Sequence, residues 1–377
     1  MGQVDQLLEE LIALPSVNPA FLPPGDRLAG EQRVADYLAS VAKKLGLPSE
    51  HAPVCPGRTN LLIRLTPTHT RRLRILLAPH LDTVGGSNLP GNLFTPRRKN
   101  ARIYGRGACD TKGSVAAMFS ALCAIARDNP PQETEIIFGG LADEESGQAG
   151  SRRLATNGFR ADLAIVGEPT QLKIVTAHKG VVWLRLTTSG KAAHGARPEL
   201  GRNAVHAMAQ IVDLLETKYA AQLRRHKHPL LGRGTINVGA IQGGSQPNIV
   251  PSSCSIMIDR RTLPGERETE VCREIRQLLK SRNLSAKVES LQGGPCWSLD
   301  TDPAQPLVAN FLSIAGQRKL AGVDYFSDAA ILAAGGIPSV LFGPGDIAQA
   351  HTPDEWIAVD SLERAERLLI RFFRSLP

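Results

Sequence analysis

Aromatic residues make up only 5% of the 377-residue chain, and no run approaches the roughly 20 apolar residues that span a bilayer. The six cysteines are scattered and form no Cys-x-x-Cys pair. A chain of this length needs no disulfide framework, so we expect free thiols and a cytoplasmic protein. The first ten residues are acidic and amphipathic, which is not typical of a signal peptide. Neither a membrane span nor a secreted disulfide scaffold is therefore expected.

Basic residues exceed acidic ones and give a formal net charge of +8. They are dispersed, and the densest clusters, at 71–74 and 224–228, fall in expected loops or strand starts. With so few aromatic residues for stacking, nucleic acid is not an expected partner. The excess charge instead favours a modest attraction to anionic substrates. The 42% hydrophobic and 21% charged content is that of a globular protein with room for two domains.

The first half of the chain alternates strand-like and helical patterns. Short apolar runs at 59–65, 73–78, 135–139 and 163–166 predict buried strands, and helical spacing occurs at 30–45 and 112–127. Asp110 or Thr111 is expected to cap the helix at 112–127. Strands separated by helices in this way predict an α/β fold with a mainly parallel, doubly wound sheet.

The pattern changes after about residue 178. Strands and helices then follow one another in the order β-α-β-β-α-β, which is typical of a ferredoxin-like α+β domain. From residue 306 the first pattern returns. We therefore predict a discontinuous larger domain at 1–177 and 292–377, with a smaller domain inserted at 178–291.

Histidine and acidic residues, which are common metal ligands, follow several of the expected strands. The run at 75–78 ends at Pro79, which cannot donate to a sheet ladder, and His80 and Asp82 come next. Parallel strands gather their chemistry at their carboxyl ends. Two imidazoles and three carboxylates suit two Zn²⁺ ions per chain, although Co²⁺ or Mn²⁺ would accept the same set. The five candidate ligands are His80, Asp110, Glu145, Glu168 and His351.

Two ions about 3.5–4 Å apart require one ligand that bridges them. Asp110 lies in a glycine-framed loop and is the expected bridge, which leaves one histidine and one glutamate for each ion. The doublet Glu144-Glu145 needs two roles, because adjacent side chains in a turn point in different directions. We predict that Glu145 binds metal and that Glu144 is the general base. Asp82 is expected to hold the ring of His80.

The order of these motifs resembles the co-catalytic zinc aminoacylase/carboxypeptidase family, which includes acetylornithine deacetylase and succinyl-diaminopimelate desuccinylase. The resemblance covers nearly the whole chain. Its matching pieces are PHLDTV (79–84), GRGACDTKG (105–113), DEE (143–145), GEPT (167–170), AHG (193–195), QPNIVP (246–251) and the segment around His351.

The resemblance implies a two-zinc catalytic domain interrupted by a lid that also forms a homodimer. It further implies that His194 reaches the partner subunit's site and stabilises the oxyanion. Asn248 and Arg261 would grip the substrate's carboxylate, for which a guanidinium is suited. Ser327-Asp328 stands where many deacetylase-like relatives carry Thr-Asp, and the substrate contact there stays open.

We therefore expect a two-zinc amidohydrolase that acts on N-acyl amino acids, with N-acetylornithine as the first candidate. The nearest alternative is succinyl-diaminopimelate desuccinylation, followed by dipeptidase or carboxypeptidase activity. A non-enzyme alternative is a zinc-dependent binding protein without catalysis. Metal binding alone would not require Glu144, which argues against that alternative.

Overall fold

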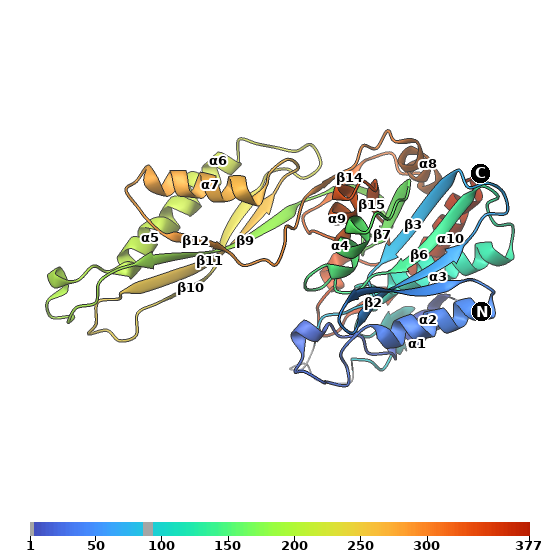
Figure 1. Ribbon diagram of the computed structural model, residues 1–377, viewed down its shortest axis with the longest axis horizontal. Helices are drawn as coiled ribbons and strands as arrows, with labels where there is room; N and C mark the ends of the chain where they lie inside the picture. Colours follow the sequence, from blue (N-terminus) through green and yellow to red (C-terminus); the bar gives the residue numbers. More distant parts are fainter. Residues whose placement is uncertain (1–3, 86–92) are drawn as a thin grey trace. The chain divides into compact units, whose positions relative to one another are not determined.

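The computed structural model describes residues 4–85 and 93–377. The chain divides into two compact units (Figure 1). Unit 1 contains the described residues up to Thr176 together with Thr301–Ala321 and Ser327–Pro377, and unit 2 contains Ala177–Asp300 and Gly322–Phe326. The first three residues of the amphipathic N-terminus lie outside the described residues.

A mixed sheet forms the middle layer of unit 1. Its central strands are parallel and follow the order β6 (Thr134–Gly140), β3 (Leu73–Pro79), β7 (Leu163–Gly167) and β15 (Ser339–Leu341). The flanking strands are antiparallel: β2 (Arg58–Leu65) and β1 (Ser49–Cys55) beyond β6, and β8 (Val175–His178) beyond β15. The predicted parallel sheet is confirmed at its centre. Strand β1 was not expected, and its tight connection to β2 allows only antiparallel pairing.

Helices cover both faces of this sheet (Figure 1). Helices on one face share a continuous apolar core with alternate strand residues such as Ile75, Leu77, Ile136 and Phe138. Burial on both faces explains why these strands appear as unbroken apolar runs in the sequence. The helices of this core are α1 (Val4–Ile12), α2 (Gln32–Lys44), α3 (Lys112–Arg127), α8 (Pro306–Ala315) and α10 (Val359–Arg374). The helices α4 (Ala149–Thr156) and α9 (Asp328–Ala334) contact each other outside this core.

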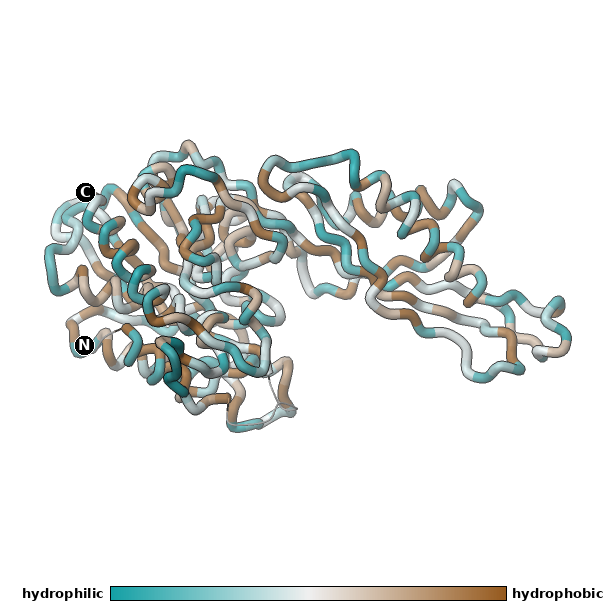
Figure 2. The backbone as a smooth tube through the Cα atoms, turned by 180° about the vertical axis from the view of Figure 1, so that it is seen from behind, coloured by the Kyte–Doolittle hydropathy of each residue, from teal (hydrophilic) through white to brown (hydrophobic). Residues whose placement is uncertain are grey.

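The hydropathy of the chain follows these layers. In Figure 2, hydrophobic segments run through the strands of the sheet, whereas the outer helices alternate between hydrophobic and hydrophilic residues. Aromatic rings reinforce the core at a few points: Phe311 lies 5.1 Å from Phe342 and 4.6 Å from Phe372, measured between ring centroids. A separate small sheet joins β4 (Arg97–Lys99), β5 (Arg102–Tyr104) and β16 (Trp356–Ala358).

Unit 2 has the predicted β-α-β-β-α-β order. Its antiparallel sheet follows the order β10 (Thr235–Gly243), β11 (Ser253–Thr262), β9 (Gly180–Ser189) and β12 (Lys287–Ser290). Helices α5 (Ala204–Leu214), α6 (Ala220–Leu223) and α7 (Glu268–Lys280) accompany it, and a π-helical turn at Leu215–Tyr219 joins α5 to α6. Apolar residues of α5 and α7 share one core with alternate residues of β9 and β11. The ferredoxin-like arrangement is thus confirmed.

The unit boundaries differ from those expected at residues 178 and 291. Strand β13 (Leu299–Asp300) pairs with the end of β8, and the amide of Val181 donates to the carbonyl of Cys296 at 3.0 Å. These backbone bonds hold residues 292–300 in unit 2. The segment 322–326, which overlaps β14 (Ala321–Val323), is held there by a Lys179–Asp324 ion pair at 2.7 Å. The segment at 292–300 has no hydrophobic periodicity that would have revealed this.

All six cysteines are free, as expected. Among the described helices, none has both the length and the apolar character that crossing a membrane requires.

A buried carboxylate joins three strands at the start of β6. Glu135 accepts from Arg74 at 2.6 Å, from Arg71 at 3.3 Å and from Arg64 at 3.5 Å. Burial acts to raise the pKa of Glu135, but these guanidinium groups outweigh it and hold the pKa below its usual value. The ionised carboxylate therefore stabilises the folded chain.

We predict that Glu135→Gln lowers the free energy of unfolding at pH 7 by about 1–3 kcal/mol, the usual cost of losing hydrogen bonds to a charged group. Because the pKa is depressed in the folded state, this stabilisation is complete above the unfolded pKa, near 4.3, and is lost as the pH falls through the folded value. Urea denaturation at pH 7 and pH 3 should show the difference between the two proteins shrinking with acid. A difference that grows would contradict the assignment.

Candidate active site

The five candidate ligands lie together at the carboxyl ends of the parallel strands. His80 follows β3, Glu145 follows β6, Glu168 follows β7 and His351 lies in the loop after β15, while Asp110 precedes α3. Their ligand atoms form two groups, each within 4.8 Å: His80, Asp110 and Glu168 in one, and Asp110, Glu145 and His351 in the other. Asp110 belongs to both groups. This is the edge at which open α/β sheets place their chemistry.

The two carboxylate oxygens of Asp110 face different imidazole rings. Oδ1 lies 3.1 Å from Nε2 of His80, and Oδ2 lies 3.2 Å from Nε2 of His351. The same nitrogen of His351 lies 3.2 Å from Oε2 of Glu145. This geometry is what a carboxylate that bridges two ions requires, with one histidine and one glutamate left for each ion.

A second observation indicates that the candidate ligands are suited to metal ions. Oε1 of Glu145 is buried and has no hydrogen-bond partner among the described residues. A buried carboxylate oxygen without a partner is costly unless a cation or a donor satisfies it. Nitrogen and carboxylate oxygen are suitable ligands for Zn²⁺, Co²⁺ and Mn²⁺.

Burial and crowding perturb the ionisation of these groups. Burial, followed by the charge of Asp110, raises the pKa of Glu168 well above its usual value. Burial also acts to raise the pKa of Asp110, but hydrogen bonds from His351 and His80 outweigh it and hold that pKa well below its usual range. Hydrogen bonds to Asp110 and Glu145 raise the pKa of His351 to about 10. The imidazoles thus carry positive charge that divalent ions would replace on binding.

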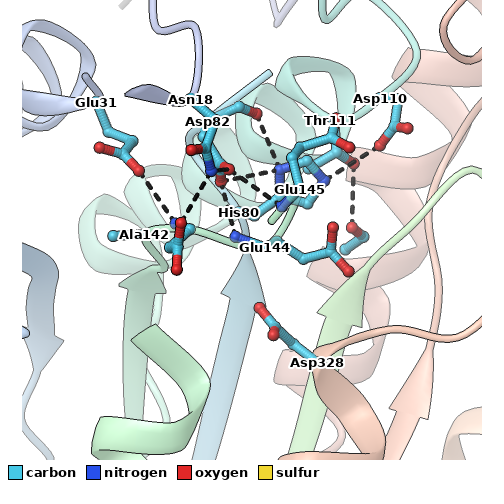
Figure 3. Close-up of polar contacts among 12 residues, drawn as sticks. Asn18, Glu31, His80, Asp82, Asp110, Thr111, Ala142, Glu144, Glu145 and Asp328 are labelled. Atoms are coloured by element: carbon cyan, nitrogen blue, oxygen red, sulfur yellow. Dashed lines mark hydrogen bonds and ion pairs between the residues drawn. The ribbon is translucent and has the colours of Figure 1, made fainter. Parts of the chain in front are cut away.

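The carboxylate of Asp82 organises the acidic doublet (Figure 3). It accepts from the backbone amides of Glu144 and Glu145, both at 3.1 Å, and from the side-chain amide of Asn18 at 2.7 Å. Nδ1 of His80 lies 2.9 Å from the carbonyl oxygen of Asp82 and 3.5 Å from its carboxylate. The backbone of Asp82 thus contacts the ring, while its side chain positions the doublet.

Asp328 approaches the doublet from α9, as Figure 3 shows. Its Oδ1 accepts from the hydroxyl of Ser151 at 2.5 Å, and its Oδ2 is buried without a partner among the described residues. Burial raises the pKa of Asp328 to about 6. For Glu144, burial and then the charges of Glu168 and Asp328 raise the pKa well above its usual value, against the opposing charge of His80. Glu144 is therefore suited to hold a proton.

Sequence reasoning missed a polar network behind the doublet. Asp143 has a left-handed backbone, with φ of 74°, and ion-pairs with Arg58 at 2.5 Å. Its backbone amide donates to Glu31 at 3.0 Å, and Arg58 also pairs with Glu31. Asn18 donates to Asp143 at 3.0 Å. These partners lie far apart in sequence, and the only local signal was an aspartate, which tolerates this conformation.

The expected cap of α3 is only partly correct. Thr111 occupies the N-cap position, but its side chain makes no capping bond. Its hydroxyl instead donates to the carbonyl of Gly167 at 3.0 Å, beside Glu168. The side chain of Asp110 faces the imidazoles and does not cap the helix either. The peptide bond between Asp110 and Thr111 is cis.

Unit 2 contains the three residues that only the resemblance had selected. His194 and Asn248 are exposed and lie on adjacent backbone segments, where the amide of Gly195 donates to the carbonyl of Asn248 at 2.7 Å. Nδ1 of His194 accepts from the amide of Ala196 at 3.1 Å. Arg261, on β11, pairs through two nitrogens with the carboxylate of Asp259, at 2.9 and 3.0 Å. Their roles in catalysis remain predictions.

Comparison with known proteins identifies the family. The model of peptidase family M20/M25/M40 matches residues 76–375, so the chain belongs to this family. The acetylornithine deacetylase of Proteus mirabilis (strain HI4320) is 31% identical over 379 residues, covering 97% of this chain and 94% of that protein. The acetylornithine deacetylase of Myxococcus xanthus is 32% identical and covers 80% and 79%.

Solved structures share the fold over nearly the whole chain. The M20 family metallo-carboxypeptidase Sso-CP2 from Sulfolobus solfataricus has a TM-score of 0.78 at 20% identity, covering 99% of each chain. The dinuclear metal-binding peptidase YXEP from Bacillus subtilis has a TM-score of 0.69 at 14% identity, covering 98% and 96%. With the family assignment, the two ligand groups define a metal-dependent hydrolase of amide bonds.

We predict that Asp110→Ala weakens both metal sites together, whereas Glu168→Gln weakens one. The reason is that Asp110 alone belongs to both ligand groups. Elemental analysis after exhaustive dialysis should give about two ions per wild-type chain. Two tightly held ions in Asp110→Ala would rule out the bridge.

Proposed function

We propose that the chain is a two-metal amidohydrolase that removes the acyl group from N-acyl amino acids, as acetylornithine deacetylase does. The observation that carries the proposal is the pair of ligand groups that share Asp110, with Glu144 beside them. The similarity to the acetylornithine deacetylase of Proteus mirabilis supports the choice of substrate class. Six free cysteines are consistent with a cytoplasmic enzyme of amino-acid metabolism.

Two divalent ions, Zn²⁺ or alternatively Co²⁺ or Mn²⁺, would supply Lewis acidity and lower the pKa of water at this site. The carboxylate of Glu144 accepts a proton from the attacking water and returns it to the nitrogen of the departing amine. Asp82 fixes the backbone from which Glu144 projects, with its oxygen 3.1 Å from that amide nitrogen.

Arg261 and Asn248 are proposed to bind the substrate's carboxylate. Asp259 fixes the guanidinium of Arg261 through Nε and Nη2, which leaves Nη1 for a second carboxylate. A guanidinium oriented in this way is suited to a carboxylate, and the amide of Asn248 adds a neutral donor. This proposal requires a substrate with a free carboxylate.

A hydrolysis screen tests the substrate. We expect N-acetylornithine to give the highest kcat/KM in the presence of Zn²⁺ or Co²⁺, compared with N-succinyl-diaminopimelate and dipeptides. A preference for the succinyl substrate or for a dipeptide would support the desuccinylase or peptidase alternatives. Metal binding without hydrolysis of any amide would favour a binding protein.

We predict that Glu144→Gln retains its metal ions and loses turnover by at least about 10²–10⁴-fold, because only the proton acceptor is removed. Glu145→Gln is the matched control, since the same change one residue later removes a metal ligand and should release an ion. Steady-state kinetics and metal analysis of both variants separate the two roles. A Glu144→Gln enzyme with near-normal kcat would exclude Glu144 as the base.

We further propose that the chain forms a homodimer in which His194 serves the partner subunit's site. The ring of His194 is exposed, and with Nδ1 bonded to its own loop, Nε2 has no partner in the part of the chain that the structure describes. The exposed edge of a sheet such as that of unit 2 is commonly covered by a symmetry mate. A histidine that donates to the oxyanion would stabilise the transition state.

Co-expression of His194→Ala and Glu144→Gln chains tests this arrangement. In a hybrid dimer, one site receives intact Glu144 and His194 from different chains, while the other has neither. Random pairing makes about half of the dimers hybrid, so about a quarter of wild-type activity should return. Each variant alone should be inactive. Hybrid dimers that form without activity would show that His194 does not act across the dimer.

A further inference from the structure

The carboxylate of Glu355 accepts hydrogen bonds from the loop that carries Asp110. Glu355 is only 2% exposed. Its Oε1 accepts from the backbone amides of Cys109 and Asp110, at 2.8 and 2.9 Å. Its Oε2 accepts from the amide of Gly107 and from Nη1 of Arg106, both at 2.9 Å. The two oxygens thus receive four hydrogen bonds, three of them from the backbone of one loop.

The same carboxylate lies four residues after His351. Arg106 also donates to the carbonyl of Thr352 at 3.3 Å, and the amide of Gly105 donates to the carbonyl of Glu355 at 3.0 Å. Glu355 and Asp110 are 245 residues apart in the sequence. These bonds therefore join two loops that the sequence separates, and each loop carries a candidate ligand of the second metal site.

The Asp110 loop contains a tight turn at Gly107. Gly107 has a φ of 81°, and a Cβ added there would lie 2.9 Å from the side chain of Thr83. The turn therefore leaves no room for a side chain of its own at this point. Its amides point instead at the carboxylate of Glu355, which fixes the direction of the backbone at Asp110.

We propose that Glu355 is a positioning residue of the metal centre, which sets the distance and direction between Asp110 and His351. The inference rests on the proposed two-metal site and adds a residue to it. Oδ2 of Asp110 and Nε2 of His351 stand 3.2 Å apart, and an ion can bind between them only if both loops keep their places. Groups behind metal ligands typically contribute 10–100-fold to metal affinity.

Glu135 offers a matched control within the same unit. It is also a buried carboxylate, at the opposite end of β6 from the acidic doublet, but its side-chain donors are all guanidinium groups. Its hydrogen-bond partners are the side chains of Arg64, Arg71 and Arg74, none of which adjoins a candidate ligand. Loss of Glu135 should lower stability and leave metal binding unchanged. A purely structural role for Glu355 would give the same result.

The test is Glu355→Gln beside Glu135→Gln. A glutamine keeps the size of the side chain, but its NH₂ group would face an amide or guanidinium donor in place of an acceptor oxygen. Competition of the metal-free proteins with a chromophoric chelator for Zn²⁺ should show about 10–100-fold weaker binding for Glu355→Gln and wild-type binding for Glu135→Gln. The visible absorption of bound Co²⁺, which depends on ligand geometry, should change only in Glu355→Gln.

The melting temperature of each metal-free protein is measured in parallel, to confirm that the Zn²⁺ affinity is that of folded protein. Glu355→Asp keeps the charge on a shorter side chain that cannot reach all four donors, and it should weaken Zn²⁺ binding in the same direction if Glu355→Gln does not fold. Wild-type Zn²⁺ affinity and Co²⁺ absorption in a folded Glu355 variant would overturn the inference. A wild-type chain that binds no metal would instead overturn the proposed function.

Discussion

The shared carboxylate of Asp110 is the constraint on which the rest of the site depends. In the proposed metal centre, this single side chain presents one oxygen to each ligand group, so its backbone position and its rotation are both restricted. Hydrogen bonds from distant segments restrict both. Glu355 accepts from the backbone amide of Asp110, and the hydroxyl of the next residue, Thr111, donates to the carbonyl of Gly167 at the end of β7. The bridge is thus as much a property of the surrounding loops as of the aspartate.

The site concentrates negative charge, and the surrounding polar groups partly offset it. Glu144, Glu145, Glu168 and Asp328 are placed close together where water is largely excluded, and burial raises the pKa of each. Two imidazoles and the network around Asp82 compensate part of this charge in the metal-free chain. Divalent cations would compensate the remainder of this charge when bound.

Much of the fold and of the ligand set could be predicted because both leave local signals. Buried parallel strands are unbroken apolar runs, and His80 and Glu168 stand directly after them. The ferredoxin-like order of unit 2 was similarly visible. Glu355, Arg58 and Asp143 gave no such signal, because their partners are backbone amides or charges that come near only after folding. Nothing in the sequence indicated that residues 292–300 belong with unit 2, because only Leu299 and Asp300 pair with β8 and the segment has no hydrophobic period.

The order of strands in the sheet has a consequence for how the chain is made. Strand β15 lies between β7 and β8, yet it is synthesised after the whole of unit 2. The ligand group of His80, Asp110 and Glu168 is encoded before unit 2, whereas the other group waits for His351, near the end of the chain. While the whole of unit 2 is translated, the central sheet of a nascent chain therefore lacks the strand between β7 and β8. Only the last 40 or so residues fill that place and complete the second ligand group at the same time.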